Sequence, residues 1–220
     1  MIDQELGRRF ELDELLDLSA TGELIRILSN VLGLRIRIYD REHKELFKTG
    51  EEDIFCSLIT SSEGGEALCQ GVKERLLTQP VSGSSALQVQ SACGAKYTVF
   101  SIQHQFESLG RVIVGPYQDA RLSDSELEAI AQRHHLDPGK FRIAYRDLPS
   151  LSSEQLKKNI RLLSKFFEVF IFINAKRLIT TIMHLNMIMQ NRDKIFEQIE
   201  KETKGTPEDV KEIDKYKDMF

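Results

Sequence analysis

The sequence predicts an α+β fold in which a five-stranded antiparallel sheet carries helices over one face and is followed by long C-terminal helices. Two observations predict this class. Between residues 34 and 117, short segments with alternating apolar residues are separated by turn signals, as in antiparallel sheets. From Ser152 onward the chain contains neither proline nor glycine until Gly205, and apolar residues recur at helical spacing.

Composition narrows the class of protein. The chain has 220 residues with 41% hydrophobic content, which is enough for one core with a helical appendage. Its formal net charge of -4 gives no general attraction to phosphate backbones, so we expect no direct nucleic-acid partner. No apolar run approaches the roughly 18 residues of a membrane span, and the first residues lack the apolar core of a secretion signal. We therefore expect a cytoplasmic protein without a membrane span.

Residues 1–33 are expected to form a helical lead-in. A helix is predicted from about Gly22 to Leu32, because its apolar residues share one face, and Gly33 is placed to end it. Apolar residues then alternate with arginine and tyrosine from Leu34 to Asp40, which is the pattern of a half-buried strand. A turn after this strand leads into a second strand at Glu45, so the two strands form a hairpin.

Two helices and three strands are predicted next. Helical spacing is found from Phe55 to Thr60 and from Gly65 to Thr78. A turn at Glu107–Ser108 is short enough to make the last two strands an antiparallel pair. The helices would lie across one face of the sheet and leave a pocket beneath them, a common position for a small ligand. The three strands are predicted at Leu87 to Cys93, Tyr97 to His104 and Leu109 to Tyr117.

All three cysteines fall in this region. Cys56 lies in the segment Phe55-Cys56-Ser57-Leu58-Ile59, Cys69 ends a Gly-x-x-x-Cys stretch, and Cys93 leads into a strand. With the Asp-ended first strand and the Gly-ended segment Leu109 to Gly115, this pattern resembles the PocR-type sensory domain, a variant of the PAS-like ligand-binding fold. The resemblance covers most of the chain from Thr21 to about Ile173. It implies a PAS-like sensory domain over residues 34–150.

The resemblance and the predicted faces together suggest a ligand pocket. Three cysteines in a reducing compartment are better interpreted as thiols or ligands than as a disulfide framework. The tyrosines offer hydroxyl groups to a small polar ligand while their rings remain packed. The candidate ligand-binding residues are Phe55, Cys56 and Cys69 from the helices and Cys93, Tyr97 and Tyr117 from the sheet.

The cysteines also allow a different chemistry. Cys56, Cys69 and Cys93 together could bind a metal ion or an iron-sulfur cluster through thiolates, with a fourth position left to another ligand. The chain has no Cys-x-x-Cys pair, so such a site would depend on tertiary placement alone. Buried free cysteines also serve as small apolar fillers. A redox role for one thiol of low pKa lies between these interpretations, and all three remain open.

The C-terminal extension over residues 151–203 divides into two halves. We expect the first half, with apolar residues at Leu156, Ile160, Leu163, Phe167 and Phe170, to pack on its own domain. Asn174 follows, and it either fixes the register of a dimer seam or faces water. Residues 204–220 form a charged tail that we expect to be loosely ordered. The second half is expected to be a dimer or partner helix through Leu178, Ile182, Leu185, Met189 and Phe196.

No catalytic motif is found in the sequence, so we expect no enzyme. Three functions are compatible with the pattern. In the leading hypothesis, a sensory module binds a small metabolite and acts through its C-terminal helices, as a homodimer, on an output partner of unknown identity. In the second, the domain is a scaffold that has lost sensing, because the family's His and Gly-Leu pair after Cys93 is replaced here by Gly94-Ala95-Lys96-Tyr97. The third is a thiolate-metal or redox sensor.

Overall fold

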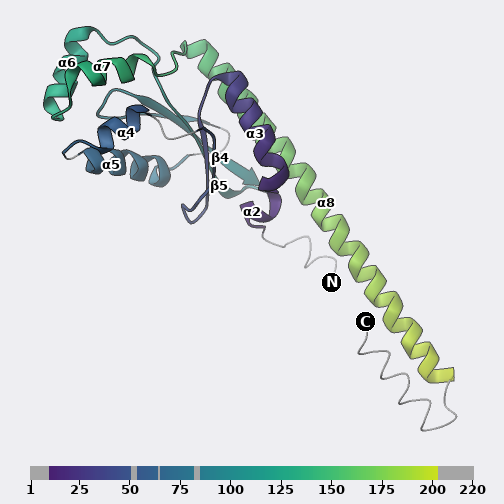
Figure 1. The fold of residues 1–220 in the computed structure, drawn as a ribbon. Coiled ribbons are helices and arrows are strands. Elements are labelled where there is room, and N and C mark those ends of the chain that lie inside the picture. Colours follow the sequence, from purple (N-terminus) through teal and green to yellow (C-terminus); the bar gives the residue numbers. More distant parts are fainter. Residues whose placement is uncertain (1–9, 51–53, 64, 82–84, 203–220) are drawn as a thin grey trace. The chain divides into compact units, whose positions relative to one another are not determined.

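The computed structural model describes residues 10–50, 54–63, 65–81 and 85–202 (Figure 1). The described residues fall into two units, one of residues 10–174 and one of residues 175–202. The first unit contains the sheet and every described helix except the later part of the last one. The fold class predicted from the sequence is confirmed, because the unit is an antiparallel five-stranded sheet with helices and leads into a long C-terminal helix.

The sheet has the strand order β2-β1-β5-β4-β3, and every neighbouring pair is antiparallel. The two hairpins β1–β2 and β4–β5 are joined by the pairing of β1 with β5, in which Arg37 lies opposite Ile113. This pairing connects segments far apart in the sequence and puts β1, β5 and β4 at the centre. The strands are β1 (Ile36–Asp40), β2 (Glu45–Lys48), β3 (Leu87–Gln90), β4 (Lys96–His104) and β5 (Glu107–Tyr117).

Capping residues stabilise the ends of several helices. Asp17 accepts hydrogen bonds from two backbone amides at the start of α3, and Gly33 ends that helix in the left-handed conformation. Ser123 and Glu126 form a capping box at the start of α6. The helices are α2 (Leu12–Leu15), α3 (Leu18–Leu32), α4 (Ile54–Thr60), α5 (Gly65–Thr78), α6 (Asp124–Arg133), α7 (Pro138–Arg146) and α8 (Ser153–Glu202).

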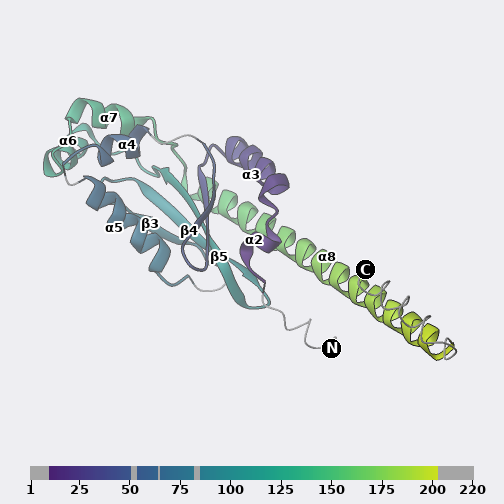
Figure 2. The same ribbon diagram turned by 60° about the horizontal axis from the view of Figure 1, so that its bottom comes forward.

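Both faces of the sheet are covered. Helices α4 and α5 lie over one face, while α3 and the beginning of α8 lie over the other (Figures 1 and 2). Successive residues of β4 therefore pack in opposite directions: Val99 joins Leu76 and Leu77 of α5 in one apolar cluster, whereas the ring of Phe100 lies 6.2 Å from that of Phe167 in α8. The second face is buried because the first half of α8 lies on it.

Two turns differ from their predicted positions. The strand predicted at Leu87 to Cys93 ends at Gln90, because Ser91 and Ala95 close a turn in which Gly94 has a positive φ of 84°. Cys93 therefore lies in a turn and not on a strand. The turn predicted at Glu107–Ser108 is also wrong: Gln105 and Phe106 form it, both with positive φ, and Glu107 already belongs to β5.

The first half of α8 packs on its own domain, as predicted. Leu156, Leu163 and Phe167 are buried, but the next buried position is Ile171 and not Phe170, which is half-buried. Asn174, for which exposure to water was one expectation, is half-buried, and its side-chain amide donates a hydrogen bond of 2.8 Å to the carbonyl of Leu15. This bond attaches α8 to the end of α2.

The second half of α8 presents apolar side chains at helical spacing. Leu178, Ile182 and Phe196 are half-buried, whereas Leu185 and Met189 are 55% and 52% exposed. None of the helices in the described part of the chain combines the length and the apolar character needed to cross a membrane.

Replacing Phe167 with alanine should destabilise the fold by about 3–5 kcal/mol, because this ring is 1% exposed and its loss leaves a cavity between α8 and Phe100. The matched change Phe172→Ala removes a ring that is 62% exposed on the same helix, and it should cost less than about 0.5 kcal/mol. Urea unfolding of the two variants would measure both values. Equal free energies of unfolding would contradict the packing described for α8.

Candidate functional site

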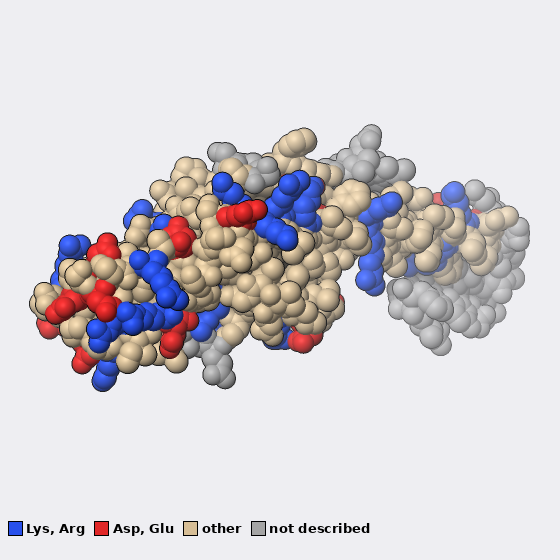
Figure 3. Space-filling view, turned by 90° about the horizontal axis from the view of Figure 1, so that it is seen from above, with Lys and Arg blue, Asp and Glu red and all other residues tan. Residues whose placement is uncertain are grey.

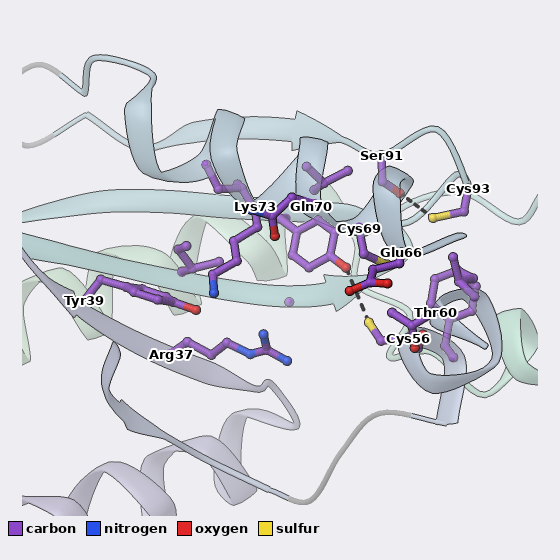
Figure 4. A pocket seen from close by; sticks show the side chains of 17 residues that line it. Arg37, Tyr39, Cys56, Thr60, Glu66, Cys69, Gln70, Lys73, Ser91 and Cys93 are labelled. Atoms are coloured by element: carbon purple, nitrogen blue, oxygen red, sulfur yellow. Dashed lines mark hydrogen bonds between the residues drawn. The ribbon is translucent and has the colours of Figure 1, made fainter. Parts of the chain in front are cut away.

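A cavity of about 250 Å³ lies between the sheet and helices α4 and α5. Side chains from β1, β4, β5, the β3–β4 turn and both helices form its walls (Figure 4). Its volume is slightly below the range usual for drug-sized ligands, so it suits a small molecule. The apolar and thiol part of the lining consists of Phe55, Cys56, Ile59, Cys69, Val72, Leu76, Cys93, Tyr97 and Ile113.

Most of the residues predicted from the sequence meet in this cavity. Phe55 and Cys56 come from α4, Cys69 from α5, and Tyr97 from β4. The sulfur of Cys56 lies 3.7 Å from the hydroxyl of Tyr97, a weak hydrogen bond that links helix and sheet (Figure 4). Cys93 also lines the cavity from its turn, and its sulfur is 3.2 Å from the hydroxyl of Ser91.

Tyr117 does not line this cavity. Its hydroxyl is hydrogen-bonded to Thr98 at 2.7 Å and accepts a hydrogen bond of 3.1 Å from the side-chain amide of Gln88. Thr98 and Gln88 both belong to the groove between the sheet and α8, so Tyr117 points to the opposite face. The physical reason is a shift of register in the β4–β5 pairing between Lys96 and Thr98, which simple alternation along β5 does not predict.

Burial favours the neutral thiol at two cysteines of the cavity, Cys69 and Cys93. Burial, together with the Cys56 and Cys93 thiols, raises the pKa of Cys69 to about 11, although Arg37 acts in the opposite direction. Burial also raises the pKa of Cys93, against hydrogen bonds that lower it. Reactive cysteines usually have lowered pKa values, so these two thiols lack the property expected of a redox switch.

The geometry does not support the predicted thiolate site for a metal ion or an iron-sulfur cluster at Cys56, Cys69 and Cys93. Within the described residues, no group of three or more His, Cys, Asp or Glu side chains is arranged to hold a metal ion. The three sulfurs share a cavity without forming a ligand set.

A group of polar side chains in the cavity was missed by the sequence analysis. Arg37 and Tyr39 enter from β1, and Glu66, Gln70 and Lys73 enter from α5 (Figure 4). Alternation along β1 did place Arg37 and Tyr39 on the opposite face from Ile36 and Ile38. A polar face of a strand is usually assigned to solvent, and only the helices packed over it show that these two residues face a cavity.

Arg37 and Tyr39 influence each other. Burial lowers the pKa of Arg37, but the neighbouring Tyr39 hydroxyl and the Glu45 carboxylate raise it by more, so the guanidinium remains charged. The Tyr39 hydroxyl donates a hydrogen bond of 2.7 Å to Glu45. Burial and this hydrogen bond to Glu45 raise the pKa of Tyr39 to about 12, so its hydroxyl keeps its proton at neutral pH.

The wall of the cavity packs against α7, the helix that precedes α8. The ring of Phe55 lies 5.7 Å from that of Phe141 and 5.9 Å from that of Tyr145, both in α7. The same apolar cluster contains Cys93 and Leu148, which lies just after α7. A residue that lines the cavity is therefore part of the core that positions the connection to α8.

Charged side chains of both signs are intermixed over α6 and α7 on the face shown in Figure 3. Asp124 lies within ion-pairing distance of Arg142 and Arg146, at 4.0 and 2.5 Å. On this face, the α6–α7 end therefore offers no field of a single sign to a charged partner.

Residues 14–175 match a known protein family, described as the sensory domain found in PocR. The match covers the sheet, the helices around the cavity and the first half of α8. Comparison with curated proteins gives no match.

Alkylation of Cys69 and Cys93 at neutral pH should be slow in the folded protein. The pKa rise of Cys69 to about 11 leaves it with roughly 100-fold less thiolate than an ordinary cysteine, and Cys93 is buried as well. Mass spectrometry after timed exposure to iodoacetamide would give the rate at each cysteine, with the urea-unfolded chain as reference. A native rate at Cys69 equal to the unfolded rate would show that its thiol is not protected.

Proposed function

The chain belongs to the PocR sensory-domain family, and on this basis we propose that it is a non-catalytic sensory module. In this proposal a small molecule binds in the cavity beneath α4 and α5, and its binding alters α8, which acts on a partner protein. The observation that carries the proposal is the cavity itself: a mainly apolar space of about 250 Å³ into which a few polar groups converge. Ligand sites commonly have this composition.

We assign ligand contact to five of the residues predicted from the sequence. Phe55 offers a buried aromatic wall, and the thiols of Cys56, Cys69 and Cys93 offer soft apolar surface. Tyr97 offers a hydroxyl group, already in weak contact with Cys56, that a polar ligand could engage. Burial raises the pKa of Tyr97 well above its usual value, so this hydroxyl keeps its proton as a donor.

Two physical routes lead from the cavity to α8. The first crosses the sheet, because β4 places Tyr97 in the cavity and Phe100 against Phe167 of α8. The second passes through Phe55 and the α7 rings that it touches. A ligand can shift α8 only if it binds one arrangement of these contacts better than another.

The exposed apolar side of α8 beyond Asn174 is the proposed interaction segment. Leu178, Ile182, Leu185, Met189 and Phe196 recur at spacings near three and four, as in a helix that packs against another helix. We propose that a second copy of the chain covers this side. A dimer would allow a small change at the start of each α8 to alter the pairing of the two helices.

A small organic ligand should raise the melting temperature of the wild-type chain, because a molecule bound only to the folded state stabilises it by mass action. Cys69→Phe should abolish this rise by filling the cavity, whereas Ser164→Phe, which obstructs the open groove under α8, should leave it intact. Each variant is compared with its own ligand-free baseline, since an oversized core side chain alone costs about 1–3 kcal/mol.

A thermal-shift screen of a metabolite library would measure the change in melting temperature of the wild type, Cys69→Phe and Ser164→Phe. A ligand whose effect survives Cys69→Phe would place binding elsewhere. A folded wild-type protein that responds to no member of the library would favour the scaffold function over sensing.

Changing Leu185 and Met189 together to aspartate should weaken self-association by about tenfold or more, because two charges would enter an apolar helix interface. Thr180 and His184 are exposed and lie on the opposite side of α8. Changing these two residues to aspartate is the control. Sedimentation equilibrium of the full chain measures both. A dimer that is insensitive to the first pair, or a wild type that is monomeric at all concentrations, would exclude this segment as the homodimer interface.

A further inference from the structure

We propose that the ligand of the cavity is a small monocarboxylate, held through its anionic end by Arg37 and Lys73, with its apolar body against Phe55 and Ile59. This inference rests on the proposed function, since it specifies the class of molecule that the sensory cavity takes. It is carried by the two cations that reach into a mainly apolar space from different elements (Figure 4).

Arg37 is kept charged by the Tyr39 hydroxyl and by the electrostatic influence of Glu45. The arginine side chain is half-buried. In the part of the chain that the structure describes, no Asp or Glu carboxylate lies within ion-pairing distance of its guanidinium. Arg111, on the same side of the sheet, shows the structural alternative: it donates hydrogen bonds to the carbonyls of Leu76 and Gln79 at the end of α5.

Lys73 approaches the same region from α5. Its ammonium lies 5.9 Å from the centre of the Tyr39 ring, and among the described residues it has no carboxylate within ion-pairing distance either. A ligand carboxylate between the two side chains would give the guanidinium a planar, two-oxygen partner and the ammonium a second contact. The half-buried Arg37 would then be paired in a partly desolvated space, where ion pairs are stronger than in water, while the exposed Lys73 would add a second cation at the edge of the cavity.

The nearby carboxylates explain why a ligand would supply this anion. Glu45 influences Arg37, but it already accepts the hydroxyl hydrogen of Tyr39. Glu66 lines the cavity too, as an exposed side chain. The two cations, Arg37 and Lys73, face the carboxylates of Glu66 in the lining and Glu45 beside Tyr39, so the site has no surplus of positive charge to balance a doubly charged phosphate, which favours a monoanion.

The test compares acids with their neutral amides. Butyrate, hexanoate and benzoate should bind the full chain, whereas butyramide, hexanamide and benzamide, which have nearly the same shape, should bind about 10- to 100-fold more weakly. Arg37→Met and Lys73→Met should each reduce binding of the acids by a similar factor. Lys140→Met removes the same charge from an exposed position on α7 and should leave binding unchanged. Ligand-observed NMR titration gives each affinity, and circular dichroism verifies that each variant is folded.

The outcomes distinguish failure of the carboxylate inference from failure of the proposed sensory function. Amides that bind as well as acids, with affinities indifferent to Arg37→Met and Lys73→Met, would overturn the carboxylate and leave a sensory cavity for neutral molecules. Binding of inorganic phosphate in preference to all three acids would overturn the choice of a monoanion. Failure of the acids, the amides, phosphate and the metabolite library alike would overturn the inference and the proposed function together.

Discussion

The alternation of side chains along the three central strands is the constraint on which the rest of this structure depends. Because both faces of the sheet are covered, each of these strands must supply one face to the cavity and the other to packing against α3 and α8. In β1, Ile36 and Ile38 are completely buried while Arg37 faces the cavity. The β1–β5 pairing sets the register, with Arg37 opposite Ile113. A slip of one residue would exchange the cavity lining with the apolar core, so fold and site depend on the same pairing.

Three cations on the described sheet differ in the partners that they have. Lys96 is bound to Asp119 at 2.6 Å, and Arg111 donates to two carbonyls at the end of α5. Such contacts offset the cost of removing a charge from water. Arg37 is half-buried. The groups that keep it charged are the hydroxyl of Tyr39 and the electrostatic influence of Glu45. A partly desolvated cation that is kept charged in this way differs from the cations that hold elements together, which is why we attribute a binding role to it.

The sequence predicted the elements well and their long-range arrangement less well. Local signals located α3 and α5, because helical spacing, Gly33 and the run from Gly65 to Thr78 are all short-range features. The turn at Gln105 and Phe106 was missed, since neither residue is a usual choice for positive φ. The clustering of Phe55 and the cysteines followed from the family resemblance together with the predicted faces of the elements. Arg37 and Lys73 were missed because alternation and helical spacing separate two sides of an element without showing what covers each side.

The connection between the sheet and α8 offers a physical path for the proposed signal from the cavity to the helix. Gln118 follows β5 directly and is almost completely buried. Its backbone amide donates to Pro149, its carbonyl accepts from Leu151, and its side-chain amide donates to Leu148. These three bonds fix the segment between α7 and α8 to the end of the strand that places Gly115 in the cavity wall. Since closely packed elements respond to strain by moving between discrete arrangements, a ligand that displaces this end of β5 must also displace the segment that leads into α8 or break these bonds.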